Sequence, residues 1–277
     1  MAYNKILIIV GIFLAIGILT RYTIFLPPKL KEVKGISITT LPTATPNEGT
    51  IPTGKFYAPI LAYHHIALKR PQNSYYVSPA IFDQQMKWLK NNDYHVITLN
   101  QFYAAAVGKE KIPKKPIVIT FDDGLRDQYI NAFPILKKYN YTATFFIKMN
   151  NLNKGGMTWA QLKELQKAGN IIGSHSVNHD NMANMPKNQL KYELEESKNI
   201  LEQNLGVKIK YFCYPGGNYS ANTIQAVKNA GYLAATTTKH KVNQEIKDSN
   251  SIYTLPRVHI DDEMPTFIDW VQGKNLF

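Results

Sequence analysis

The sequence predicts an α/β fold, a distorted (β/α) barrel of about seven strands that forms one domain behind an N-terminal apolar segment. From Lys55 onward, short apolar runs alternate with amphipathic segments, which is the pattern of parallel strands joined by crossover helices. With 277 residues, 44% of them hydrophobic and 12% aromatic, the chain can bury a core of that size. Seven or eight strands that are each followed by a helix favour a barrel over an open sheet, although periodicity alone does not separate the two.

The first element is the apolar segment at the N-terminus. Ile6–Leu19 is an unbroken run of 14 apolar or glycine residues after Lys5, and extending it to Leu26 gives 21 residues that include Arg21. This length suits a signal peptide or a membrane anchor better than a buried core helix. Because no small-x-small cleavage site follows, we expect residues 1–27 to be an uncleaved anchor in the cell membrane. Cleavage would instead make the protein secreted.

The second element, residues 28–54, is predicted to be a linker. It is rich in Thr and Pro from Gly35 to Gly54 and has no helical or strand periodicity, which is typical of an extended tether. Basic residues lie on both sides of the apolar segment, so the positive-inside rule does not fix the orientation. We expect the domain at residues 55–277 to lie outside the cytoplasm, because a tether of this kind lifts a domain off a membrane.

Within residues 55–277, strands and helices are predicted from composition and from helix-capping residues. Ser78 followed by Pro79, Thr158, and Ser220 each mark the start of a helix, and a long amphipathic helix from Lys187 ends at Gly206. The predicted strands are Pro59–Tyr63, His95–Leu99, Ile117–Phe121, Thr142–Ile147, Ile171–Gly173, Tyr211–Tyr214, Leu233–Thr237 and Leu255–Ile260.

The charge and cysteine content exclude some classes of partner. The net charge is +12, and residues 1–54 carry five basic and two acidic side chains, which leaves +9 for residues 55–277. Such a surface favours polyanions, including an acidic cell-wall polymer. The basic residues are scattered and no nucleic-acid motif is present, so we expect no nucleic acid partner. Cys213 is the single cysteine, so the chain has no internal disulfide. The sequence does not indicate an oligomeric state.

The stretch PIVITFDDGLRDQ, Pro116–Gln128, runs an apolar strand directly into two adjacent carboxylates, Asp122 and Asp123. Behind a buried strand, each carboxylate raises the pKa of the other unless a positive charge lies nearby. A cation is therefore expected beside them, and a metal ion is the first candidate. Alone, the pair could equally serve as a helix cap and a solvated turn, since Gly124 allows a turn.

Further polar residues follow other predicted strands. IIGSHSVNHD gives His175 and His179, spaced four apart, and YTLPRVHIDD places Arg257 and His259 on the last strand. Functional groups of parallel α/β folds gather at the carboxyl ends of the strands, so we expect these residues near the carboxylate pair. Two imidazoles and one carboxylate suit zinc or a similar divalent ion with one position open for water. The second carboxylate can accept a proton from that water.

The motifs TFDDG and HSVNH together resemble the first two motifs of the polysaccharide deacetylases, also called NodB-homology or carbohydrate esterase family 4 enzymes. The stretches YHHI, ITFDDG, ATFFI, MTWAQLKEL and YPGGNY are similar to the branch that deacetylates poly-N-acetylglucosamine and related bacterial polymers. The resemblance extends from Tyr57 to Trp270. The two leading motifs are highly specific as a pair, whereas either one alone is a weak signal.

The resemblance implies a role for each matching residue. It implies that Asp122 is the general base and that Asp123, His175 and His179 bind the metal, which is zinc or alternatively Co, Ni or Mn. The metal would activate water against the acetyl carbonyl of an N-acetyl sugar. The metal and a backbone N–H after Pro215, that of Gly216, would stabilise the oxyanion. The histidine that protonates the departing amine would be His259, the only late histidine on a predicted strand.

The chain also departs from the family pattern. Many members carry an arginine three residues before the motif proline, which pairs with the base, whereas this chain has Phe212 there. We predict that Arg257 takes over this role. The Asp-Trp pair that usually precedes the last strand is absent, since Asp269 and Trp270 come after it.

Aromatic and histidine residues near the motifs are further candidates. Tyr214 and Trp159 are predicted to contact substrate, although packing of the helix is an equal alternative for Trp159. For His64 and His65, strand alternation points the two rings to opposite faces, so one is expected to line the site and neither to bind metal. Cys213 is expected to be buried and unreactive.

The sequence therefore predicts a membrane-anchored, metal-dependent enzyme that removes N-acetyl groups from a β-linked N-acetylglucosamine polymer. The candidate substrates are poly-N-acetylglucosamine, peptidoglycan and chitin oligomers. Two alternatives stay open from the sequence alone. One is a carbohydrate-binding or scaffold protein that keeps the fold without efficient catalysis, and the other is a deacetylase of O-acetyl esters.

Overall fold

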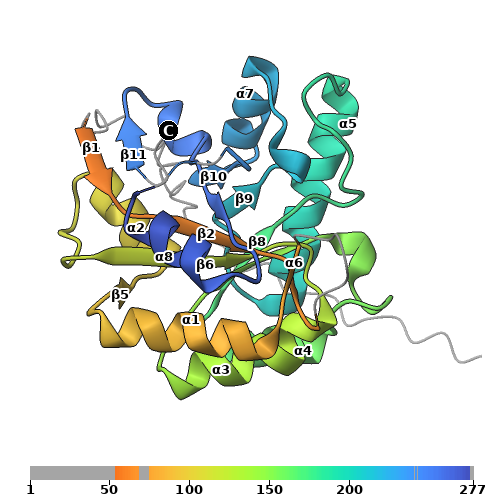
Figure 1. Ribbon diagram of the computed structural model, residues 1–277. Coiled ribbons are helices and arrows are strands. Elements are labelled where there is room, and N and C mark those ends of the chain that lie inside the picture. The colour runs from red at the N-terminus through yellow and green to blue at the C-terminus, as the bar shows by residue number, and fades with distance from the viewer. Residues whose placement is uncertain (1–53, 69–74, 240, 242, 275–277) are drawn as a thin grey trace, which may run out of the picture. The chain divides into compact units, whose positions relative to one another are not determined.

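The computed structural model describes residues 54–68, 75–239, 241 and 243–274 (Figure 1). The predicted anchor at residues 1–27 and, apart from Gly54, the predicted linker at residues 28–54 lie outside the described residues. Within the described part of the chain, no helix has both the length and the hydropathy that crossing a membrane requires. The described residues cover most of the predicted domain at residues 55–277.

Seven parallel strands form the main sheet. Their order is β10-β9-β8-β7-β6-β2-β12, and β5 (His95–Val96) pairs with the beginning of β6. With its helices, this sheet is a parallel half-barrel, in agreement with the predicted (β/α) class. The seven strands are β2 (Ile60–Tyr63), β6 (Pro116–Phe121), β7 (Thr144–Ile147), β8 (Ile171–Ser174), β9 (Tyr211–Cys213), β10 (Ala234–Thr236) and β12 (Val258–His259).

The segment 255–259 connects β10, at one edge of this sheet, with β2, beside which its end forms the other edge strand, β12. At its start, Leu255 forms a parallel bridge with Thr236 of β10, and the Leu255 carbonyl accepts a hydrogen bond from Thr237 N at 2.9 Å. At its end, Val258 pairs with Leu61 of β2. Arg257 lies between these two attachments, so its backbone is fixed from both sides.

Two small pairs of strands lie outside the main sheet. Strand β1 (Gly54–Tyr57) pairs antiparallel with β11 (Asn243–Ile246), and β3 (His65–Ile66) pairs in parallel with β4 (Tyr76–Val77). None of these four strands was predicted, because two- and four-residue strands carry too little apolar pattern to be recognised. The β3–β4 pair adds a wall beside the end of β2.

The predicted helix starts are confirmed. The Ser78, Thr158 and Ser220 side chains each accept a hydrogen bond from the first turn of their helix, and Gly206 ends α6 with a left-handed φ of 68°. The helices are α1 (Pro79–Asn91), α2 (Leu99–Ala106), α3 (Phe133–Lys138), α4 (Trp159–Lys167), α5 (Lys187–Lys191), α6 (Ser197–Leu205), α7 (Ala221–Asn229) and α8 (Met264–Val271).

Two π-helical turns interrupt this helical pattern. Turn η1 (Gln128–Ala132) leads into α3, and turn η3 (Tyr192–Glu196) joins α5 to α6 within the single long helix that the sequence predicted. Such turns are rare and occur often at functional sites, because they re-aim the side chains that follow.

Two predicted strands are wrong in part. The prediction of strand at His95–Leu99 fails after Val96, because Thr98 forms a capping box with Gln101 and starts helix α2. The predicted strand Leu255–Ile260 is reduced to Val258–His259, because the segment changes partner from β10 to β2 along its length.

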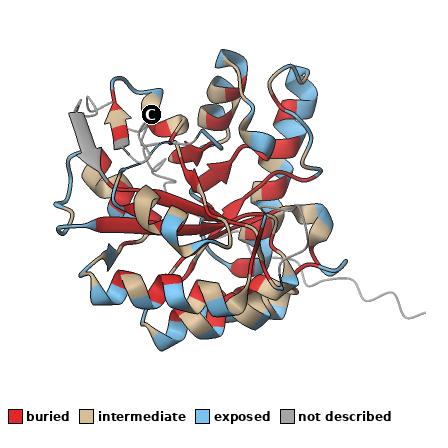
Figure 2. Ribbon diagram, in the orientation of Figure 1, coloured by how far each residue is buried: buried red, intermediate tan, exposed pale blue. Residues whose placement is uncertain are grey.

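The alternation of side chains along the strands divides the core into two clusters. Ile117 and Ile119 of β6 belong to the larger cluster, which includes the apolar faces of α1, α4 and α6, whereas Val118 belongs to the cluster on the other face. Phe145 and Phe146 of β7 separate in the same way. Figure 2 shows the main-sheet strands β2 and β6 to β10 buried along most of their length and exposed residues concentrated on the helices and connections. Since both faces of the sheet are covered, polar chemistry is left to the strand ends.

Candidate active site

A cavity of about 590 Å³ lies at the carboxyl ends of β2, β6, β8 and β12. Both predicted carboxylates, both predicted imidazoles, Arg257 and His259 face it, as expected for a fold of this class. The lining residues are Ala62, His64, His65, Tyr75, Asp122, Asp123, His175, His179, Gly216, Thr238, Arg257 and His259.

Asp122 and Arg257 form a buried, bidentate ion pair. Arg257 Nη1 donates to Asp122 Oδ1 at 2.8 Å and Nη2 donates to Oδ2 at 2.6 Å, and both side chains are at most 2% exposed. Burial raises the pKa of the Asp122 carboxyl, but the charge and hydrogen bonds of Arg257 outweigh it and hold that pKa well below its usual range. Asp122 is therefore ionised, and the predicted pairing of Arg257 with this carboxylate is present.

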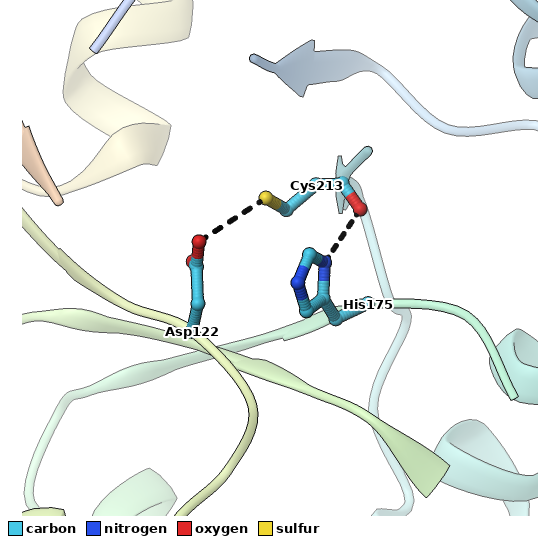
Figure 3. A group of neighbouring side chains, drawn as sticks. All are labelled: Asp122, His175 and Cys213. Carbon is cyan, nitrogen blue, oxygen red and sulfur yellow. Dashed lines mark hydrogen bonds between the residues drawn. The ribbon is translucent and has the colours of Figure 1, made fainter. Parts of the chain in front are cut away.

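Cys213 packs against this ion pair from β9. Its Sγ lies 3.6 Å from Asp122 Oδ2 and accepts a hydrogen bond from Arg257 Nη2 at 3.0 Å. Figure 3 shows Cys213 between Asp122 and His175, with its carbonyl oxygen turned toward the imidazole. Asp122, His175 and Cys213 are close enough together to suggest a cation site, but the Arg257 guanidinium already supplies the positive charge beside Asp122 and Cys213. Cys213 is buried, as predicted.

Asp123, His175 and His179 form a second group next to this ion pair. His179 Nε2 lies 3.1 Å from His175 Nε2, and Asp123 Oδ1 lies 3.8 Å and 3.7 Å from the Nε2 atoms of His175 and His179. A tetrahedral zinc ion with metal-to-ligand bonds of about 2.0 Å separates neighbouring ligand atoms by roughly 3.3 Å, so these donors fit such an ion with little movement. The group agrees with the N,N,O set that the sequence predicted.

Backbone and side-chain hydrogen bonds orient both imidazoles. His175 Nδ1 donates to the Cys213 carbonyl at 2.7 Å, which fixes the tautomer with an Nε2 lone pair facing Asp123. The Ser176 Oγ accepts from His179 N at 2.9 Å. Burial and the neighbouring His175 lower the pKa of His179, which favours the neutral, metal-binding form.

Glu193 of η3 holds the loop between the two imidazoles. Its Oε2 accepts hydrogen bonds from Val177 N at 2.8 Å and Asn178 N at 2.9 Å, and Asn178 Nδ2 donates to Oε1. Glu193 is only 2% exposed. The buried Glu193 carboxylate therefore fixes the backbone from which His175 and His179 project. Glu193 was not predicted from the sequence as a site residue.

Gln128 of η1 has a similar function on the other side of the pocket. Its Nε2 donates to the Asp122 carbonyl at 2.6 Å and to the His64 carbonyl at 2.9 Å. This amide joins the end of β6 to the end of β2. Both π-helical turns thus supply a buried side chain that fixes a segment of the pocket.

Three non-glycine residues of the site adopt left-handed backbone conformations. The φ angles are 73° at Asp123, 66° at Ser176 and 70° at His179. Such angles are uncommon outside glycine, although Asp and His adopt them more readily than most residues. Their concentration at the Asp–His–His group indicates that the surrounding hydrogen bonds enforce this geometry.

The prediction that only one of His64 and His65 lines the site is wrong, because both face the cavity. Strand alternation does not apply across them, since β2 ends at Tyr63 and β3 begins at His65. His64 Nε2 lies 3.8 Å from Asp122 Oδ2, and burial lowers the pKa of His64 to about 4. Neither histidine belongs to a candidate metal group of the described residues.

The late histidine, His259 of β12, lines the same cavity as the two carboxylates. Its ring centroid lies 5.5 Å from that of His64 and 4.9 Å from that of Tyr75. The imidazoles of His64 and His259 therefore lie side by side at the cavity.

The remaining predicted residues lie at different depths. Gly216 lines the cavity, whereas Pro215 and Tyr214 are buried behind it, with the Tyr214 ring packed on Phe212. Trp159 begins α4 and packs against the main core; it is not among the residues that line the cavity. Helix packing, the alternative for Trp159, therefore describes its position.

Comparison with known proteins places the chain in a family. A family model described as polysaccharide deacetylase matches residues 109–235. YxkH of Bacillus subtilis (strain 168) is 31% identical over 207 residues, which cover 74% of this chain and 72% of that protein. The poly-beta-1,6-N-acetyl-D-glucosamine N-deacetylase of Staphylococcus aureus (strain MRSA252) is 30% identical over 205 residues, or 69% of each chain.

A solved structure shows the same arrangement. The Streptococcus pyogenes deacetylase PplD, determined in complex with acetate, superimposes with a TM-score of 0.72 at 29% identity, over 78% of this chain and 97% of that one. Fold, pocket and sequence similarity agree on one class of protein, a hydrolase that acts on amide bonds. The chain belongs to the polysaccharide deacetylase family, as its motifs indicated.

Proposed function

We propose that this protein removes N-acetyl groups from a β-linked N-acetylglucosamine polymer by hydrolysis that depends on a divalent metal ion. The observation that carries the proposal is the contrast between the ionised, buried Asp122 and the adjacent Asp123–His175–His179 group. A site with its own base and a separate set of metal-binding donors suits hydrolysis and has no use in a binding module. The name of the Staphylococcus aureus relative makes poly-N-acetylglucosamine the first substrate to test, ahead of peptidoglycan and chitin oligomers.

Asp122 acts as the general base in this proposal. Arg257 keeps its carboxylate charged and fixes both oxygens, and Asp122 lines the cavity. Asp122 can therefore accept a proton from water at neutral pH without first losing one of its own. Arg257 takes the role of the arginine that this chain lacks at Phe212, which removes the main reason for expecting a scaffold without catalysis.

Asp123, His175 and His179 would bind the divalent ion, zinc first and Co, Ni or Mn as alternatives. When bound there, the ion would polarise the acyl oxygen and lower the pKa of water. The Gly216 N–H is proposed to donate to the developing oxyanion. The neighbouring Gly217 N–H is already bonded to the Tyr214 carbonyl at 2.8 Å, and Gly216 itself lines the cavity with a left-handed φ of 59°.

A histidine of the pocket must protonate the departing amine. The family resemblance implies this role for His259, and His64, whose Nε2 lies 3.8 Å from Asp122 Oδ2, is the second candidate. Single variants separate the two. If His259→Ala loses turnover by about a hundredfold or more while His64→Ala does not, His259 is the acid; the reverse pattern assigns the proton to His64.

The substrate class is tested by measuring acetate release by the purified full chain. The panel consists of poly-N-acetylglucosamine, chitin oligomers, peptidoglycan and O-acetylated xylan, each with added zinc. We expect release from at least one N-acetylglucosamine polymer and a lower kcat/KM for the xylan ester. Release from xylan alone would show that the enzyme is an esterase of O-acetyl groups and contradict the proposal.

We further propose that residues 1–27 anchor the protein in the cell membrane and that the domain works outside the cytoplasm, or is secreted if this segment is cleaved. The proposed substrates are polymers of the cell envelope, which supports this placement. Protease added to intact cells should digest the domain; full protection of the domain with intact membranes would contradict it.

A further inference from the structure

His65 and Asp127 form a second His–Asp pair at the cavity, separate from the groups described above. His65 Nδ1 lies 2.6 Å from Asp127 Oδ2, and Asp127 Oδ1 accepts a hydrogen bond from Ile66 N at 3.1 Å. The His65 ring is stacked on Tyr76, with centroids 4.1 Å apart and planes 6° from parallel. A carboxylate and an aromatic ring therefore hold this imidazole in one orientation.

The orientation leaves the other ring nitrogen for a ligand. His65 lines the cavity and its side chain keeps 29% of its exposure, and among the described residues no partner is recorded for its Nε2. With Nδ1–H donating to Asp127, Nε2 accepts a hydrogen bond in the neutral ring and donates one in the charged ring. A sugar hydroxyl can both donate and accept, so it matches Nε2 in either state.

The position of His65 separates it from the reacting acetyl group. Its chain neighbour His64 lies 3.8 Å from Asp122, and the His64 ring centroid lies 4.6 Å from that of Tyr75. Among the described residues, the ion pair of His65 is with Asp127 and not with Asp122 or Asp123. His65 belongs to the β3–β4 wall and Tyr75 lies directly before β4, and both line the cavity. A polymer bound at Asp122 can therefore extend along this wall.

We propose that His65, positioned by Asp127, hydrogen-bonds a hydroxyl of the sugar next to the one that is deacetylated. Tyr75, which is 52% exposed on the same wall, offers an aromatic face for that sugar ring. This inference rests on the proposed function, because it assumes a polymer of sugars in the cavity. It makes His65 a residue that selects for chain length rather than one that performs chemistry.

The test compares chain-length dependence in matched variants of the full chain. His65→Phe keeps a ring on Tyr76 but removes Nε2, His65→Gln restores a polar group, and Asp127→Asn loosens the imidazole. His95→Phe is the control, since His95 is exposed and pairs with Pro116 at the opposite end of β6 from Asp122. KM and kcat are measured with N-acetylglucosamine oligomers of increasing length, and zinc content and circular dichroism are recorded for every variant.

We expect His65→Phe to raise KM for the longer oligomers by about three- to tenfold, the effect of one lost hydrogen bond, with little change in kcat. His65→Gln should recover part of the loss, Asp127→Asn should show a smaller loss, and His95→Phe should match the wild type. An unchanged KM in His65→Phe, or a fall in kcat alone, would overturn the inference while acetate release by the wild type upholds the proposed function.

Binding measured without turnover further distinguishes a failure of the His65 inference from a failure of the proposed function. Calorimetric titration of an oligomer into zinc-loaded Asp122→Asn should give a dissociation constant about three- to tenfold lower than titration into Asp122→Asn with His65→Phe. Equal dissociation constants would contradict the role of His65. Absence of oligomer binding to both proteins, with no acetate release by the wild type, would contradict the proposed function and this inference together.

Discussion

Asp122 and Asp123 are neighbours in the chain, yet they lie in opposite environments. The Asp122 side chain is 2% exposed and is paired with Arg257, whereas the Asp123 side chain is 24% exposed and faces the two imidazoles of His175 and His179. The difference follows from burial, because a buried carboxylate needs a cation supplied by the chain itself. A partly exposed carboxylate beside two imidazoles can instead bind a cation from solution.

Under the proposed function, this comparison divides the pocket into a base side and a metal side. The base side consists of Asp122, Arg257 and Cys213, and the metal side consists of Asp123, His175 and His179. Each side has its own positive charge, which is Arg257 on the base side and the proposed divalent ion on the metal side. Damage to one side should therefore leave the function of the other measurable.

The largest effects are expected at the two carboxylates. Asp123→Asn should abolish both metal binding and acetate release, because it removes a donor from the metal side. Asp122→Asn should bind zinc with wild-type affinity but lose about 10²- to 10⁴-fold in kcat, the usual contribution of a general base. Zinc content by atomic emission and acetate release are measured on the same samples. Loss of zinc in Asp122→Asn would show that the two sides are not separate.

Removal of the arginine should have the next largest effect. Arg257→Met leaves the buried Asp122 carboxylate without a partner, which costs about 3–5 kcal/mol of folding stability. Since Arg257 lowers the pKa of Asp122, its loss raises that pKa, and the low-pH limb of kcat/KM should move to higher pH. Arg257→Lys, which retains a charge, serves as the better-folded comparison.

The same pair also predicts how stability depends on pH. A carboxyl group whose pKa is lower in the folded protein stabilises the fold above its unfolded pKa of about 4, and this stabilisation is lost as pH falls through the lower folded value. Urea unfolding of the wild type should therefore show a stability loss on acidification below about pH 4 that is smaller in Arg257→Met. Identical pH profiles for the two proteins would contradict the role of Arg257.

A moderate effect, confined to the metal side, is expected from Glu193→Gln. The substitution weakens the hydrogen bonds to Val177 N and Asn178 N without removing a metal-binding donor. Groups that orient metal-binding residues typically contribute 10- to 100-fold in metal affinity, so zinc affinity should fall by about that factor. Activity at saturating zinc should approach the wild-type value. A lower kcat at saturating zinc with normal zinc affinity would show that Glu193 acts on turnover and not on metal binding.

The smallest effect is expected from Cys213→Ala. His175 is oriented by the Cys213 carbonyl, which the substitution keeps, while the thiol only packs against the Asp122–Arg257 pair. Zinc affinity should be unchanged, and the loss of stability should be roughly 1 kcal/mol. A large fall in zinc affinity would mean that the thiol, and not the carbonyl, acts on the metal side.

The metal side could be predicted from the sequence because its residues lie in two short motifs. Asp123 follows a strand directly, and His175 and His179 share one loop, so their proximity requires only that neighbouring parallel strands end at the same edge. The capped helices were predictable for the same reason, since Ser78, Thr158 and Ser220 act within their own first turn.

The base side depends on contacts between distant parts of the chain. Arg257 reaches Asp122 because the segment 255–259 bridges β10 and β2. The sequence suggested this pairing only through the absence of the family arginine at Phe212. His64 was underrated because strand alternation was applied beyond the predicted end of the strand at Tyr63, whereas His64 lies in the connection between β2 and β3. Glu193 gave no signal at all, since its burial arises from the packing of η3 against the loop that it binds.

The most direct test of the central claim is acetate release by the full chain from an N-acetylglucosamine oligomer, before and after treatment with a chelator and after zinc is added back. We predict that acetate release stops with the chelator and returns in full at one equivalent of zinc, and that cobalt, nickel or manganese can replace zinc. Unchanged release in a chelated protein shown to contain no metal would contradict it.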